Sequence, residues 1–296
     1  MRQREVDAQV IAHHSELGES PIWDDEKKKA YWVDITGERI HEYNPENGKV
    51  RSMKTGQMVG AVAPTSQGKL VAAMQHGFYI VDMDNHDFHF LSDPEEEKSN
   101  NRFNDGKCDT EGRFWAGTIS LTREKGAAAL YCLNKRRKVR KMHSPVTVSN
   151  GLAWNRDRNC MYYIDTPEQQ VVVFNYEFQT GDIFTPRPVI DFTEEKGKPD
   201  GMTIDSEGKL WIAHFEGGKV SRWDPDTGEK QEEINLPVSL VTSCTFGGKD
   251  LNQLFVTTAD VKLTEKEKKE QPMAGFTFVI TLEHVTGLPP NRYQGA

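Results

Sequence analysis

The sequence predicts an all-β fold, a six-bladed β-propeller formed by residues 1–296 as a single domain. One pattern recurs six times: a short apolar strand, a turn rich in Asp, Asn or Gly, and a second apolar strand. The copies begin 41 to 50 residues apart, a period typical of propeller blades with three or four strands. Helical periodicity never extends beyond about three turns, which disfavours a fold with large helices.

The first and fourth copies, residues 19–34 and 150–165, show the pattern most clearly. They align without a gap on Trp23 and Trp154, and both end in an aromatic pair, an aliphatic residue and Asp. The other four copies keep the same plan, with turns of one of two lengths. In chain order, the aligned anchor residues are Trp23, Pro64, Cys108, Trp154, Ile204 and Phe246.

Further strand-like runs follow each copy, separated from it by turn signals such as Asn47-Gly48 and Thr180-Gly181. These runs supply the outer strands of each predicted blade. They cover residues 39–43, 78–82, 129–133, 171–176, 219–223 and 276–282.

The N-terminal run, residues 6–12, precedes the first copy and has no hairpin of its own. We expect it to supply the outer strand of the last blade and so to close the ring. Closure matters because an open ring would leave sheet edges exposed.

Composition and charge exclude several classes of function. Lys and Arg number 37 against 45 Asp and Glu, a net charge of −8, and this acidic balance without a basic tract disfavours a nucleic-acid partner. Apolar runs are far shorter than a membrane span requires, and no secretory signal is visible. Four scattered cysteines form no CxxC pair, so we expect free thiols and a cytoplasmic location. They are Cys108, Cys132, Cys160 and Cys244.

Candidate ligands for a cation fall at one position of the repeat, four residues before each anchor. The six residues there are Glu19, Gly60, Asn104, Asn150, Asp200 and Thr242. Because the innermost strands of a propeller line its channel, equivalent positions form a ring, and four of these carry carboxylate or amide oxygens. Each could be a turn former when taken alone. As a set they predict one divalent cation, Ca²⁺ foremost, although Mg²⁺, Mn²⁺ or Zn²⁺ would also be accepted.

Arg102 lies two residues before Asn104 and could point into the same channel. Its planar guanidinium would suit hydroxyl or carboxylate oxygens of a substrate, and a surface salt bridge is the alternative. We expect Asp105 and Lys107 to be structural. The sequence contains no GxSxG nucleophile elbow and no glycine-rich phosphate loop.

Several long motifs resemble the regucalcin/gluconolactonase (senescence marker protein) family of six-bladed propellers. They stand at residues 18–23, 101–118, 149–154, 199–205 and 242–248. The resemblance implies hydrolysis of sugar lactones and a metal held by Glu19, Asn150 and Asp200. It also implies that Asn104 lies close to the metal or its water, and that Arg102 and Asn104 contact the substrate.

The chain departs from the family pattern at Ile119–Arg123. Regucalcin-like members carry acidic residues there, including a sugar contact, whereas this chain reads Ile-Ser-Leu-Thr-Arg. The substrate preference of those members therefore does not carry over.

These observations lead to the hypothesis of a metal-dependent lactonase acting on a small-molecule lactone, with Asp200 as the general base for water. One rival is a calcium-dependent phosphotriesterase that uses a similar metal shell. The other is a non-catalytic propeller that only binds a divalent cation. The natural lactone and the oligomeric state do not follow from the sequence.

Overall fold

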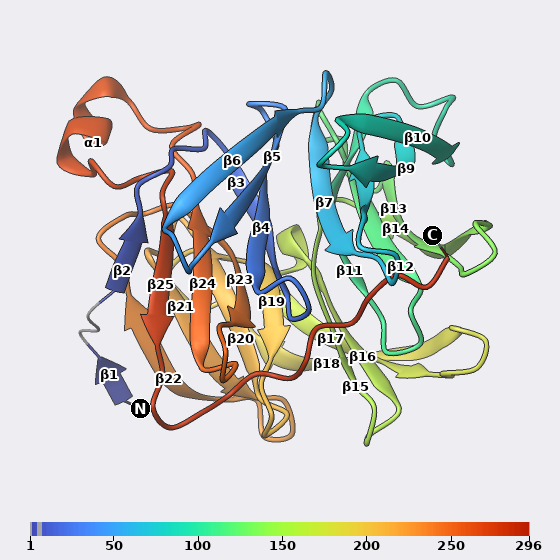
Figure 1. Ribbon diagram of the computed structural model, residues 1–296. Helices are drawn as coiled ribbons and strands as arrows, with labels where there is room; N and C mark the ends of the chain where they lie inside the picture. The colour runs from blue at the N-terminus through green and yellow to red at the C-terminus, as the bar shows by residue number, and fades with distance from the viewer. Residues whose placement is uncertain (1, 5–7, 296) are drawn as a thin grey trace.

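The computed structural model describes residues 2–4 and 8–295, and within them six β-sheets surround a central channel (Figure 1). This confirms the predicted all-β, six-bladed propeller. In the first three blades, from the innermost strand outwards, the strands are β3 (Gly18–Asp24), β4 (Lys29–Asp34), β5 (Arg39–Asn44) and β6 (Lys49–Lys54); β7 (Val59–Pro64), β8 (Leu70–Met74), β9 (Gly77–Asp82) and β10 (Asp87–Ser92); and β11 (Asn101–Cys108), β12 (Phe114–Ser120), β13 (Ala128–Leu133) and β14 (Val139–Val146).

The last three blades repeat this antiparallel order, with short helical segments in two connections. Their strands are β15 (Ser149–Asn155), β16 (Cys160–Asp165), β17 (Gln170–Tyr176) and β18 (Ile183–Asp191); β19 (Lys198–Ile204), β20 (Leu210–Phe215), β21 (Lys219–Asp224) and β22 (Glu229–Asn235); and β23 (Val241–Gly247), β24 (Gln253–Thr258) and β25 (Thr277–Thr281). The helical segments are the 3₁₀ turn η1 (Thr166–Glu168) and the helix α1 (Glu265–Glu270). All six anchor residues fall in innermost strands, as the repeat predicts.

The ring is closed by the N-terminal segment. Strand β2 (Ala8–Ile11) pairs antiparallel with β25 and forms the outer strand of the sixth blade, as expected. Residues 6 and 7 of the predicted closing run lie outside the described residues. The sequence did not indicate β1 (Arg2–Arg4), which adds a fifth, parallel strand to the fifth blade beside β22.

The core lies mainly between neighbouring blades, where apolar faces of adjacent sheets interlock. Trp115 of the third blade, for example, packs against Trp154 and Tyr176 of the fourth. All four cysteines are buried and free, as predicted. Among the described residues, no helix has the length and apolar character that a membrane crossing requires.

The aspartates that end the first and fourth copies position the inner strands. Asp34 accepts hydrogen bonds from the backbone N–H groups of Glu16 and Leu17, just before β3. Asp165 does the same for Thr147 and Val148, just before β15. These acceptors, the buried Asp34 and the half-buried Asp165, satisfy backbone donors that would otherwise be unpaired, and so they fix how the chain enters each inner strand.

A C-terminal segment, residues 283–294, crosses one end of the channel (Figure 1). It is attached to separate blades: Gly287 bridges to Asp205, and the buried Tyr293 donates from its hydroxyl to the Asn134 carbonyl at 2.9 Å. Arg292 donates to Asp24 at 2.5 Å. We call residues 283–294 the strap; it leaves the opposite end of the channel open for the candidate site.

Candidate metal centre and active site

Five predicted site residues line one cavity of about 290 Å³. They come from four different innermost strands and are Glu19, Arg102, Asn104, Asn150 and Asp200. The predicted convergence of the four oxygen-bearing ring residues is therefore found. The remaining lining is largely apolar and includes Ile35, Val148 and Phe215.

The register is interrupted at the ring position in five innermost strands and directly after it in β3, where Glu19 stays paired with Val33. In β3 the register with the second strand shifts between Glu19 and Ile22, and in β19 it shifts between Pro199 and Met202. The other four inner strands shift at the equivalent place. A bulge leaves a residue out of the ladder and redirects its side chain. The sequence repeat predicted which residues occupy these positions, but it did not predict the bulges.

Two ring positions have structural roles. A Cβ on Gly60 would lie 2.5 Å from the Phe103 carbonyl and 2.7 Å from the backbone nitrogen of Asn104, so only glycine lets β7 approach β11 there. Thr242 donates from its hydroxyl to the Gly18 carbonyl at 2.5 Å, next to Glu19. Gly60 and Thr242 therefore help to position β11 and β3, the strands that carry Asn104 and Glu19.

A chain of hydrogen bonds orients the two amides. Asn104 donates from Nδ2 to Asn150 Oδ1 at 2.9 Å and to the Ser149 carbonyl at 2.8 Å. Asn150 in turn donates from Nδ2 to Thr166 Oγ1 at 2.7 Å. Arg102 Nη1 donates to Asn104 Oδ1 at 2.8 Å. Asn150 therefore keeps an oxygen lone pair available, while Asn104 Oδ1 is engaged by the guanidinium.

Sequence reasoning missed Thr166. It belongs to η1, and its hydroxyl also donates to the Pro199 carbonyl beside Asp200. Thr166 therefore links the Asn150 side chain to the strand that carries Asp200. Because it lies after a second strand and outside the six ring positions, the repeat contained no signal for it.

The two carboxyl groups of the cavity are buried, with Glu19 3% and Asp200 7% exposed. Burial raises the pKa of both groups well above the usual range, and the charge of Asp200 raises the pKa of Glu19 further. Asp200 Oδ1 is buried and has no hydrogen-bond partner among the described residues. Buried acidic oxygens without partners cost free energy unless a proton or a cation compensates them.

This donor set fits a hard divalent cation. Two carboxylates and the Asn150 amide oxygen are the type of ligand that Ca²⁺ prefers. In the part of the chain that the structure describes, no group of three or more His, Cys, Asp or Glu residues could hold a metal. A cation here would therefore depend on amide oxygens as well as carboxylates.

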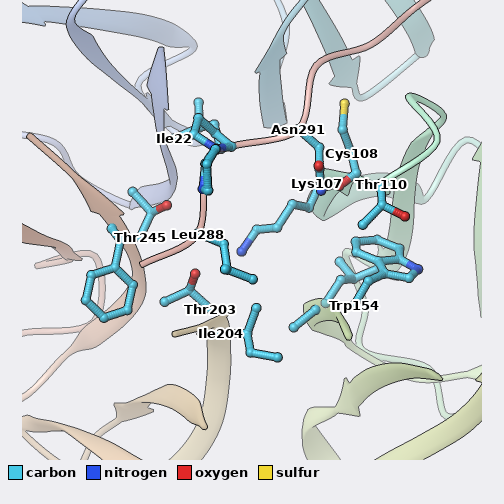
Figure 2. Close-up of a pocket in the computed structure, with 15 residues that line it drawn as sticks. Ile22, Lys107, Cys108, Thr110, Trp154, Thr203, Ile204, Thr245, Leu288 and Asn291 are labelled. Atoms are coloured by element: carbon cyan, nitrogen blue, oxygen red, sulfur yellow. Dashed lines mark hydrogen bonds between the residues drawn. The ribbon is translucent and has the colours of Figure 1, made fainter. Parts of the chain in front are cut away.

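Asp105 and Lys107 continue along the channel toward the strap. Asp105 Oδ1 accepts from Ser20 Oγ at 3.0 Å and from the Gly106 backbone at 2.7 Å. Lys107 points into a second, smaller cavity of about 100 Å³, beside Leu288 of the strap (Figure 2), and donates to the Met202 carbonyl at 2.6 Å. These contacts agree with the structural roles expected for both residues.

The fold and site together define a six-bladed propeller with a cavity of carboxylate and amide oxygens at one end of its channel. The family model described as SMP-30/Gluconolactonase/LRE-like region matches residues 17–260, and the chain belongs to this family.

Similar proteins cover almost the whole chain. "Putative sugar lactone lactonase YvrE" of Bacillus subtilis (strain 168) is 44% identical over 279 residues, which is 94% of this chain and 95% of that protein. Regucalcin of Danio rerio is 40% identical over 97% of each chain. The solved structure of a calcium-binding protein, regucalcin, from Agrobacterium tumefaciens superposes with a TM-score of 0.94 at 27% identity and 99% coverage of both chains.

Proposed function

We propose that this chain, a single domain over residues 1–296, hydrolyses lactones, foremost sugar lactones such as gluconolactone, with the help of a divalent cation. The observation that carries the proposal is the buried group of Glu19, Asn150 and Asp200, with the unpartnered Oδ1 of Asp200, in a ligand-sized cavity. The names of the Bacillus subtilis and regucalcin relatives support the same reading.

Glu19, Asn150 and Asp200 would hold the cation, with Asn104 close to the metal or its water. Oxygen donors favour Ca²⁺, and Mg²⁺, Mn²⁺ and Zn²⁺ are the other candidates. A bound divalent cation would supply Lewis-acid polarisation of the lactone carbonyl and stabilise the oxyanion that forms when water attacks.

The remaining steps belong to the chain itself. Asp200 is our candidate general base: it would take a proton from the attacking water, and its Oδ1 has no competing hydrogen bond. Arg102 and Asn104 would orient the substrate, because the guanidinium already fixes the Asn104 amide and retains unused N–H donors. The apolar lining would limit the entry of bulk water. The free, buried thiols suit a cytoplasmic setting.

The decisive experiment measures gluconolactone turnover after chelation and after each of the four metals is restored. We expect activity to disappear with chelation and to return with Ca²⁺ or another of these ions. Asp200→Asn should lower kcat by a factor of about 100 or more at saturating metal, within the range usual for loss of a general base. Asp191→Asn, an exposed position on β18, is the matched control and should keep wild-type turnover.

Either of two results would overturn the proposal. A large rate preference for an aryl phosphotriester over every lactone would favour the phosphotriesterase. Tight metal binding without hydrolysis of any lactone would favour a purely cation-binding propeller. Normal turnover by Asp200→Asn would remove Asp200 from the role of base.

A further inference from the structure

The cavity contains more positive than negative side chains. Its lining includes two carboxylates, Glu19 and Asp200, which the proposed cation would neutralise. Against them stand four cationic side chains, Arg102, Arg123, Lys198 and Lys262. Arg102 is buried, whereas Arg123, Lys198 and Lys262 are exposed at the edge of the cavity, where their charges would act on an approaching ligand.

Most of these cations have partners close by. Lys198 and Lys262 share one carboxylate, Glu216, with Nζ–O distances of 3.0 and 3.7 Å. Lys262 also lies 4.7 Å from the centre of the Phe215 ring. Arg102 is buried and donates to the Phe103 carbonyl and to Asn104 Oδ1. The single carboxylate of Glu216 therefore balances only one of the two lysine charges.

Arg123 differs from the other three cations. Its side chain has no carboxylate or hydrogen-bond partner among the described residues, and it is exposed at the edge of the cavity. Burial lowers the pKa of Arg102 to about 10, and the charge of Arg123 nearby also acts to lower it. Two guanidinium groups on one cavity, one of them unpaired, are the kind of arrangement that recognises a carboxylate or a phosphate.

The backbone holds Arg123 in place between β12 and β13. Its N–H donates to the Ser120 carbonyl at 2.9 Å, and its φ of 56° lies in the left-handed region that bulky residues seldom adopt. This turn directly follows Ile119, which lines the same cavity.

Building on the proposed function, we infer that the substrate is an anionic lactone of sugar size, with a carboxylate or phosphate group remote from the reacting carbonyl. Arg123 would contact this group and determine specificity, with Lys198 and Lys262 adding long-range attraction at the cavity mouth. The lactone carbonyl would then lie toward Glu19 and Asp200.

Two matched substrate pairs test this inference. D-glucaro-1,4-lactone differs from D-glucono-1,4-lactone only in having a carboxylate at carbon 6, and 6-phosphoglucono-1,5-lactone differs from glucono-1,5-lactone only by the phosphate. With spontaneous hydrolysis subtracted, we expect kcat/KM to favour the anionic member of at least one pair by about tenfold or more, as a charge-assisted hydrogen bond would give. The pair that shows this preference indicates whether the anionic group is a carboxylate or a phosphate.

Substitutions at Arg123 assign the preference to this residue. Arg123→Gln should reduce the anionic-to-neutral ratio of kcat/KM by about tenfold, and Arg123→Glu should invert it. Arg123→Lys should retain part of the preference, because it keeps the charge but not the planar fork. Lys125→Gln, in the same turn but outside the cavity lining, is the matched control and should keep the wild-type ratio.

Failure of this inference is distinguishable from failure of the proposed function. If the wild-type protein hydrolyses neither member of either pair at saturating metal, the lactonase proposal itself fails. If it hydrolyses the neutral lactones as fast as the anionic ones, or if Arg123→Gln leaves the ratio unchanged, the anionic substrate is wrong and the lactonase proposal stands.

Discussion

At Gly60 the missing side chain allows β7 to touch β11 beside Asn104. We expect Gly60→Ala to lower the free energy of unfolding by about 3 kcal/mol or more, because the new Cβ would meet rigid backbone 2.5 Å away. Gly48→Ala is the matched control: Gly48 has open space around its Cβ position and a φ of 68°, so its cost should be about 1 kcal/mol.

Denaturant unfolding of the two variants measures the difference, and lactone turnover of folded Gly60→Ala shows whether Asn104 has moved. Equal losses of stability in the two variants would contradict the close-approach argument.

Arg102 has two roles, fixing the Asn104 amide and offering its remaining donors to a ligand. We expect Arg102→Lys to raise KM by about 10- to 100-fold, because a lysine cannot hold both acceptors in one plane. The thermal midpoint should change little, since lysine keeps the positive charge at this position and no carboxylate loses a charge partner. Arg156→Lys is the control, because Arg156 lies outside the cavity lining and contacts only Glu111, by an ion pair, and the Phe178 ring among the described residues. Steady-state kinetics that show an unchanged KM for Arg102→Lys would remove Arg102 from substrate binding.

The positions of the candidate ligands could be predicted because each repeat copy carries the same anchor. Counting back from Trp23 and Ile204 was sufficient to place Glu19 and Asp200 on one ring. The contacts that orient them could not be predicted in the same way. The bulges break the ladder without changing the alternation of residue types, and Thr166 reaches Asn150 only through tertiary packing.

Among the elements, the closing strand β2 has the clearest energetic role. It covers the edge of β25 with four paired residues and buries Ile11 in an apolar cluster between the sixth and first blades. By contrast, β1 adds only a fifth strand beyond a complete blade. We therefore expect deletion of residues 2–4 to change the thermal midpoint by less than about 2 °C, a cost of under about 1 kcal/mol.

Deletion of residues 2–11 should lower the midpoint by about 10 °C or more and promote aggregation, because it exposes the edge of β25 and opens the ring. Calorimetry and light scattering on both deletions, each with the initiating Met retained, provide the measurement. Equal midpoints would show that β2 does not contribute to closure.

Hairpins and strand order could be predicted element by element, because Asn-Gly and Thr-Gly turns separate apolar runs of the length of a strand. The parallel pairing of β1 could not, since it follows from where the N-terminus emerges after β2 has entered the sixth blade. The attachment of the strap could not be predicted from the sequence either. Its attachment through Gly287, Arg292 and Tyr293 depends on contacts with the first, second, third and fifth blades, which are far apart in the sequence.

In the whole molecule, β2 closes the ring of blades and the strap crosses one end of the channel, which leaves the other end for a ligand. Strand β2 joins the sixth blade to the start of the chain, and the strap crosses the channel end that contains Lys107 (Figure 2). A ligand would therefore enter from the face that carries Glu19, Asp200 and Arg123. The candidate site needs every inner strand in register, so its ligands depend on the stability of the complete ring.

That stability should depend on pH through buried histidines. His214 is fully buried between blades; it hydrogen-bonds the Lys196 carbonyl at 3.0 Å and Ser221 Oγ at 2.5 Å. Burial lowers the pKa of His214 to about 4. The unfolded chain would therefore take up a proton below about pH 6.5, while the folded protein would not until about pH 4. Its contribution to stability is complete above pH 6.5 and is lost as the pH falls toward 4.

We expect His214→Gln, which keeps one donor and one acceptor but cannot titrate, to reduce this pH dependence. Between pH 6.5 and 4 the slope of unfolding free energy against pH should decrease by up to about 1.4 kcal/mol per pH unit relative to the wild-type protein. Urea unfolding at saturating Ca²⁺ measures the slope, and comparing the two proteins cancels the contribution of Glu19 and Asp200. A slope that stays unchanged would mean that His214 already carries a proton in the folded ring.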